Sequence, residues 1–105
     1  PNDSVKVCIQ LPVYNEPDKV IDLLRSIALV RWPDSALTIQ VLDDSNDTTS
    51  KIITEILAKL RSERATLAIE HLCRSHRNGY KAGALEYGRK RSNADLFVVL
   101  DCDFK

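Results

Sequence analysis

Two apolar periodicities alternate along this chain, and their alternation restricts the folds open to it. Short β-rich runs occupy residues 5–11, 37–42, 66–72 and 96–100. The stretches between them carry apolar residues at helical spacing, around residues 17–28, 52–60 and 81–91. Strands that alternate with helices predict βαβ units on a parallel sheet rather than a helical bundle or a β-sandwich. We therefore expect an α/β fold with a mostly parallel, four-stranded sheet flanked by helices.

Proline and glycine set the expected boundaries of these elements. Pro12 has no backbone donor, so the first strand is expected to end before it. Pro17 suits the first turn of the first helix. Gly83 and Gly88 weaken the prediction of the third helix, because glycine has a low helix propensity. The apolar run at residues 96–100 is expected to be a buried strand.

The composition fits one globular domain over residues 1–105. A hydrophobic content of 44% is ample for a packed core. Fifteen basic residues balance fifteen acidic ones, so no global field would attract nucleic acid or an anionic membrane. No apolar run approaches the roughly 18 residues of a membrane span. The start of the chain also lacks the pattern of a signal peptide, and we expect this piece to be soluble.

The cysteines and histidines show no sequence spacing typical of a metal site. Cys8, Cys73 and Cys102 are too few for a disulfide framework and form no CxxC pair, which fits a reducing compartment. Cys8 and Cys102 lie beside apolar runs, where a buried filler role is expected. His71 and His76 have no ligand spacing with other histidines or cysteines, so ordinary surface or loop roles are expected.

Polar loops follow three of the four predicted strands. They cover residues 12–16, 43–47 and 101–105. Parallel strands place their carboxyl ends along one edge of a sheet, and ligands of open α/β sheets bind at that edge. Acids gathered there would repel one another unless a cation or a hydrogen-bonded ligand stabilised them. We therefore expect these loops to form one ligand site.

Asp101 and Asp103 are the strongest chemical feature of the chain. They flank Cys102 directly after the apolar run, where a divalent ion that carries a phosphate can be held. Asp103 is expected to coordinate Mg²⁺ or Mn²⁺, and Asp101 to contact a sugar hydroxyl, a ribose or a metal-bound water. The alternative is that the two acids only cap a following helix.

The other two loops supply candidate contacts to a nucleotide base. A carboxylate of Asp43 or Asp44 could accept the N3 hydrogen of a uracil ring, although both acids could instead satisfy backbone donors of a turn. Tyr14 offers an aromatic face on which a base could stack. Glu16 could contact the ligand or support the dipole of the following helix.

A basic loop precedes the third predicted helix. Cations and helix amino ends both favour phosphate. Lys81 is the first candidate for a diphosphate contact and Arg77 the second, against the common alternative of a solvated basic loop.

Four motifs in register make the chain resemble the amino-terminal half of a family 2 glycosyltransferase with the GT-A fold. The resemblance is to the cellulose synthase-like and glucomannan synthase-like branch, and it spans essentially the whole chain. The matching stretches are residues 10–16 (QLPVYNE), 40–45 (QVLDDS), 77–85 (RNGYKAGAL) and 101–104 (DCDF).

This resemblance implies a Rossmann-like GT-A half-domain with strand order 3-2-1-4 that ends just after the metal motif. It implies a UDP- or GDP-linked sugar donor and a divalent metal, Mg²⁺ or Mn²⁺, at Asp103 with Asp101. The donor site that it implies consists of Pro12, Tyr14, Glu16, Asp43, Asp44, Lys81 and Asp101.

The resemblance also describes the parent protein. It implies an inverting hexosyltransferase that acts on a saccharide or lipid acceptor, in a parent anchored in the membrane with this domain facing the cytoplasm. The Thr-Glu-Asp and Gln-x-x-Arg-Trp motifs of such enzymes are not in these residues. The catalytic base is therefore expected downstream, and the isolated chain is expected to be inactive and able to self-associate through exposed edges.

The sequence is also compatible with three other classes of protein. A haloacid dehalogenase-like phosphatase also carries two aspartates after an apolar strand, but its motif stands early in the domain. A phosphoacceptor receiver carries its acids after the first strand, where this chain has Pro12. A noncatalytic nucleotide-binding or interaction module is the third alternative.

Overall fold

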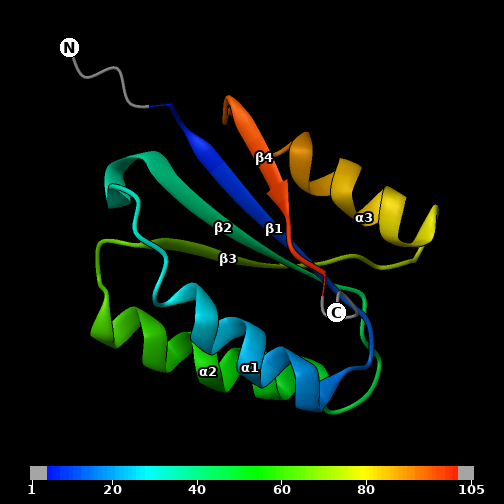
Figure 1. Cartoon of the computed structure of the whole chain (residues 1–105). Coiled ribbons are helices and arrows are strands. Elements are labelled where there is room, and N and C mark those ends of the chain that lie inside the picture. Colours follow the sequence, from blue (N-terminus) through cyan, green and yellow to red (C-terminus); the bar gives the residue numbers. More distant parts are fainter. Residues whose placement is uncertain (1–4, 102–105) are drawn as a thin grey trace.

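A four-stranded parallel sheet with helices on both faces forms the protein, whose computed structural model describes residues 5–101 (Figure 1). The strand order is β3-β2-β1-β4, as expected. The strands are β1 (Val7–Val13), β2 (Leu37–Asp43), β3 (Ala68–Cys73) and β4 (Leu96–Val99). The helices are α1 (Pro17–Ile27), α2 (Thr49–Glu63) and α3 (Tyr80–Arg89), with a short 3-10 turn at Asp34–Ala36. Helices α1 and α2 cover one face, and α3 lies on the other (Figure 1).

The main core lies between the sheet and the pair α1 and α2. Strand residues such as Ile39 and Val41 alternate onto this face and are fully buried. From the helices, Leu24 and Leu57 pack against them with no exposed surface. Burial of each side chain of this size contributes roughly 1.5 to 3 kcal/mol to the stability of the fold. This layer therefore holds the strands, and with them the carboxyl edge of the sheet, in place.

A buried polar pair joins the sheet to α3 on the opposite face. Gln10 Nε2 donates to Gln40 Oε1 at 3.0 Å and to the carbonyl of Leu85 at 3.0 Å. Gln40 Nε2 donates to the carbonyl of Gly88 at 2.8 Å. Both glutamines are almost fully buried, and these bonds give each amide group hydrogen-bond partners. They also fix where α3 lies on the sheet.

The expectation that Pro12 ends the first strand is wrong. Strand β1 continues to Val13 and pairs with β2 through Pro12 and Leu42. The Leu100 N–H donates to the carbonyl of Gln10, so the backbone groups of Gln10 point toward β4. Backbone groups alternate in direction along a strand, so those of Pro12 also point toward β4. The pairing of β4 with β1, however, ends at Val99. The missing donor of Pro12 therefore removes no hydrogen bond from the sheet.

The expectation of a buried fourth strand is also wrong. Among residues 5–101, strand β4 lies at the sheet edge and pairs only with β1. Its apolar side chains stay accessible, with Leu96 at 53% and Val99 at 46% exposure. An edge strand has one neighbour instead of two, and the helices leave these side chains uncovered. Within residues 5–101, no helix combines the length and apolar character that a membrane span needs.

Candidate functional site

A pocket of about 180 Å³ lies where β1, β2 and β4 end and α3 begins. It is on the α3 side of the sheet, because Leu42 and Ala84 form part of its wall. Its lining combines residues from four separate segments of the chain: Pro12, Val13, Tyr14, Glu16, Leu42, Asp44, Arg77, Lys81, Ala84 and Asp101. The predicted carboxyl edge of the sheet is thus a concave surface.

The pocket brings together six of the residues assigned to the donor site from the sequence. These are Pro12, Tyr14, Glu16, Asp44, Lys81 and Asp101. Asp43 does not line it, because its side chain turns to the opposite face of the sheet, toward His71. Asp103 lies outside the described residues. The ligand roles of all these residues stay predictions.

Hydrogen bonds between two loops place Tyr14 beside Asp44. The backbone N–H of Asn15 donates to Ser45 Oγ at 2.8 Å, and Asn15 Nδ2 donates to Asn46 Oδ1 at 2.8 Å. The N–H of Asn46 returns a bond to Asn15 Oδ1 at 2.9 Å. Asn15 has a φ of 50°, a left-handed conformation that asparagine tolerates better than most residues. The loops after β1 and β2 therefore form one unit.

Asp44 is held by Arg74, a residue that sequence reasoning did not select. Arg74 Nε donates to Asp44 Oδ1 at 3.1 Å, and Arg74 Nη2 donates to Oδ2 at 2.6 Å. The two side chains are only 5% and 6% exposed. The hydrogen bond to Asp44 raises the pKa of Arg74. The signal available in the sequence was a basic residue two positions after the predicted strand at 66–72.

Arg74 also shapes the loop that leads into α3. Its Nη1 donates to the carbonyl of Asn78 at 2.9 Å, and its Nη2 donates to the carbonyl of Tyr80 at 3.0 Å. The turn passes through Gly79 at a φ of 76°, a conformation that favours glycine. One guanidinium thus joins the β2 end to the α3 start.

Arg77 covers the ring of Tyr14. Its guanidinium carbon lies 3.6 Å from the centroid of that ring, and Arg77 Nε lies 3.8 Å from Asp44 Oδ2. The Nε group is buried and has no hydrogen-bond partner among residues 5–101. A cation stacked on an aromatic face is favourable. One face of Tyr14 is therefore occupied by Arg77 in the ligand-free chain.

Lys81 and Asp101 form an ion pair across the mouth of the pocket. Lys81 belongs to the first turn of α3, and Asp101 follows β4. Carboxylate oxygens are the donors that Mg²⁺ and Mn²⁺ prefer, so Asp101 fits the metal expected here. Lys81 adds a positive charge beside the same carboxylate.

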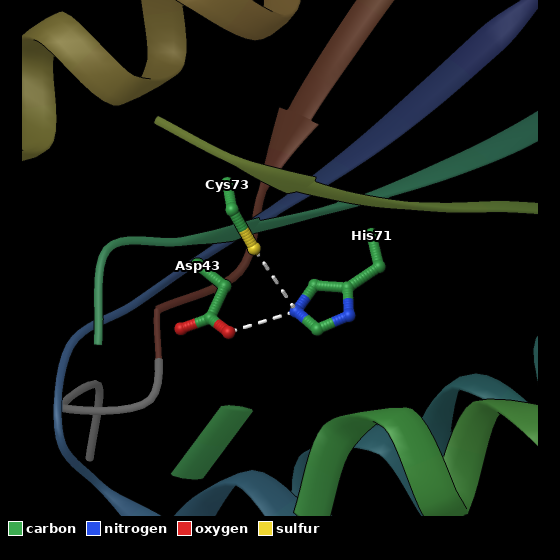
Figure 2. Close-up of side chains that lie close together, drawn as sticks. All are labelled: Asp43, His71 and Cys73. Atoms are coloured by element: carbon green, nitrogen blue, oxygen red, sulfur yellow. Dashed lines mark hydrogen bonds and ion pairs between the residues drawn. The ribbon is translucent and has the colours of Figure 1, made fainter. Parts of the chain in front are cut away.

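A second cluster of polar side chains lies on the opposite face of the sheet (Figure 2). Asp43 is fully buried and accepts from the Ser45 N–H at 2.9 Å and the Ser50 hydroxyl at 2.6 Å. His71 Nε2 lies 2.7 Å from Asp43 Oδ2 and 3.6 Å from Cys73 Sγ. Sequence reasoning expected an ordinary role for His71, because these partners are 2 and 28 residues away from it.

The electrostatics of this cluster favour a negative charge on Asp43 and a neutral thiol on Cys73. Burial opposes ionisation of Asp43, but the hydrogen bonds from His71, Ser50 and Ser45 outweigh it and lower the pKa of this carboxyl. Partial burial, together with the charges of Asp43 and Asp44, raises the pKa of Cys73. The potential around the thiol is therefore negative.

Comparison with known sequences adds the family context. The sequence model described as "Glycosyl transferase family 2" matches residues 8–105. The chain is 36% identical over 102 residues to glucomannan 4-beta-mannosyltransferase 9 of Arabidopsis thaliana, covering 94% of this chain and 19% of that protein. It is 34% identical to a probable glucomannan 4-beta-mannosyltransferase 4 of Oryza sativa subsp. japonica, with 94% and 18% covered. The chain thus spans about a fifth of the length of such relatives.

Solved structures share the fold. A mannosyltransferase from Pyrobaculum calidifontis, in complex with GDP-Man and Mn²⁺, superposes with a TM-score of 0.80 at 25% identity, over 98% of this chain and 29% of that one. S. aureus TarS superposes with a TM-score of 0.75 at 23% identity, over 94% of this chain and 17% of that one. The α/β architecture with the order β3-β2-β1-β4 is therefore one that known proteins adopt.

Proposed function

Because the chain belongs to glycosyltransferase family 2, we propose that its residues form the donor-binding half of a mannosyltransferase that uses GDP-mannose. The pocket at the carboxyl edge carries this proposal, since it collects six predicted donor contacts from four segments. The preference for GDP-mannose rests on relatives named as mannosyltransferases, one of them solved with GDP-Man and Mn²⁺. The family membership leaves the phosphatase and receiver classes without support.

The geometry suggests a division of labour within the pocket. Tyr14 would contact the base, with Asp44 accepting hydrogens from the base edge. Arg74 would hold the Asp44 carboxylate in place through its two hydrogen bonds. For a base to stack on the ring face that Arg77 covers, Arg77 would have to move off that face.

The phosphates would meet positive charge at the start of α3. Lys81 is in the first turn of α3, and the amino end of a helix also favours anions. Asp101 is the described residue that would hold a divalent ion, with Asp103 as its predicted partner. When bound, such an ion stabilises the negative charge that develops on the departing diphosphate.

The pocket volume fits a partial site. Typical ligand pockets measure roughly 300 to 1,000 Å³, whereas the described residues enclose about 180 Å³. The rest of the donor site, the acceptor site and the catalytic base would come from the remainder of the parent protein. We propose that this parent is an inverting, membrane-anchored enzyme with a saccharide acceptor, and that the 105-residue chain alone transfers no sugar.

Calorimetric titration of the chain tests the proposal. GDP-mannose is expected to bind more tightly with Mn²⁺ than without it, and more tightly than UDP. Tyr14→Ala is expected to weaken binding by about 5- to 150-fold, because base stacking contributes about 1 to 3 kcal/mol. Lys81→Gln should also weaken it, whereas Lys51→Gln, an exposed position in α2, should not.

Two results would count against the proposal. Absence of binding by GDP-mannose and UDP at millimolar concentration would show that these residues do not form a donor site on their own. Tighter binding of UDP than of GDP would instead overturn the assignment of the base. A circular dichroism spectrum of each variant separates loss of binding from loss of fold.

A further inference from the structure

The side chains of Asp43, His71 and Cys73 converge from two neighbouring strands (Figure 2). Asp43 ends β2 and pairs in register with Cys73, the last residue of β3. His71 stands two residues before Cys73 on the same strand, so the two side chains share one face of the sheet. Their ligand atoms all lie within 4.8 Å of one another.

The contacts meet at one nitrogen of His71. Its Nε2 atom lies 2.7 Å from Asp43 Oδ2 and 3.6 Å from Cys73 Sγ. In a nucleophilic triad the acid and the nucleophile sit at different ring nitrogens, so that the imidazole can pass a proton between them. Here both face the same atom. This arrangement is unsuited to a triad, whereas it is the one that three ligands of a shared cation need.

The distance between the ligand atoms of His71 and Cys73 is close to the distance between two ligands of a tetrahedral zinc ion. With Zn–N near 2.0 Å and Zn–S near 2.3 Å, the nitrogen and sulfur ligands are about 3.5 Å apart. The observed separation between His71 Nε2 and Cys73 Sγ is 3.6 Å. A carboxylate ligand would stand about 3.3 Å from the nitrogen, so the Asp43 oxygen has to move away from the present 2.7 Å.

The donor set selects the metal. A thiolate and an imidazole favour Zn²⁺ over the Mg²⁺ or Mn²⁺ expected at Asp101, which prefer oxygen ligands. Hydrogen bonds from Ser45 and Ser50 orient the Asp43 carboxylate, as outer partners do in metal sites. Asp43 and a Cys73 thiolate would together balance the two charges of the ion.

We propose that Asp43, His71 and Cys73 bind a Zn²⁺ ion on the face of the sheet opposite the donor pocket. Three protein ligands leave a fourth position to water, and the exposed Cys73 leaves this position open to solvent. On binding, the Cys73 thiol releases its proton to solvent, and the neutral imidazole of His71 coordinates through Nε2 with its proton on Nδ1. The site is independent of the proposed donor pocket and needs no nucleotide.

Co²⁺ is the probe that tests this site, because its visible spectrum reports its coordination geometry. The metal-free, reduced chain is titrated with Co²⁺ and then with Zn²⁺. We expect one equivalent of Co²⁺ to give the visible bands of a tetrahedral ion together with a thiolate charge-transfer band. An equivalent of Zn²⁺ should then remove both.

Matched variants assign the ligands. Cys73→Ser should abolish the charge-transfer band and weaken Zn²⁺ binding at least tenfold, and His71→Gln should weaken it similarly. Cys102→Ser and His76→Gln are the controls, each removing a side chain of the same type elsewhere, and both should leave the spectrum unchanged. Cys73 is exposed, so Cys73→Ser is expected to fold.

Two outcomes would overturn the assignment. One is the absence of tetrahedral bands at millimolar Co²⁺. The other is a charge-transfer band that survives Cys73→Ser and disappears in Cys102→Ser, which would show that Cys102 supplies the thiolate ligand. Nucleotide is absent throughout, so neither result bears on the donor proposal.

Discussion

Single charged residues decide how the pocket at the carboxyl edge of the sheet is arranged. Asp44 lies in the pocket wall, yet both of its oxygens already accept from Arg74 in a nearly buried pair. Arg77 then stacks on Tyr14 and stands near the same carboxylate. Arg74 therefore holds the carboxylate that the sequence predicts as a base contact, whereas Arg77 covers the ring of Tyr14. Both arginines belong to the loop between β3 and α3.

Loss of Arg74 is predicted to destabilise the fold. Arg74→Gln leaves the buried Asp44 carboxylate without its bidentate partner, and breaking such a pair costs about 3 kcal/mol or more. Arg74→Lys should restore only part of this, because lysine cannot form the planar two-bond contact. Urea unfolding followed by circular dichroism measures the change.

The ion pair of Arg89 with Glu86 provides the control for this measurement. The pair has a comparable bidentate geometry, but its side chains are 56% and 47% exposed. Arg89→Gln is therefore expected to change the free energy of unfolding much less than Arg74→Gln does. Equal effects of Arg74→Gln and Arg89→Gln would contradict the importance given to burial.

Among the elements, α3 shows why local propensity misjudges a helix that packs closely. Its glycines weakened the helix prediction, yet the helix forms over Tyr80–Arg89. A Cβ atom at Gly88 would lie 2.3 Å from Gln40 Oε1 and 2.9 Å from Gln10 Nε2. Glycine lets the helix backbone approach the glutamine pair, and the bond to the Gly88 carbonyl depends on that approach.

Gly88→Ala is accordingly predicted to destabilise the protein, although alanine favours helices by about 1 kcal/mol over glycine. The clash with the glutamines should outweigh this gain and lower the free energy of unfolding by about 1 to 3 kcal/mol. The reverse change at an exposed position of the same helix, Ala82→Gly, should cost about 1 kcal/mol from propensity alone. A stabilised Gly88→Ala protein would show that the contact is not tight.

For the whole molecule, stability is expected to be uneven across the sheet. Strands β1 and β2 are central and carry fully buried residues, whereas β4 pairs on one side and leaves its apolar side chains exposed. Local opening needs least free energy where burial is least. The apolar surface of β4 is also the part of the sheet that the described residues leave uncovered.

Amide hydrogen exchange of the chain is predicted to follow this order. The amides of Ile39 and Val41 in β2 should exchange slowest, and those of Val98 and Val99 in β4 at least tenfold faster. Strand β3 provides an internal comparison, because it too lies at an edge but packs Ile69 in the core. Uniform protection across β2, β3 and β4 would contradict the prediction.

The sequence by itself determined the order and type of the elements, because periodicity and turn residues are local signals. It also placed Tyr14, Asp44 and Asp101 at one edge, since parallel strands end on the same side. Only the tertiary structure decided that β1 runs through Pro12, that β4 is exposed and that Asp43 turns away from the pocket. These features depend on which strand is the neighbour and which face a side chain takes, and packing between distant segments sets both. The same packing brings His71 and Cys73 to Asp43, a contact that no local spacing encodes.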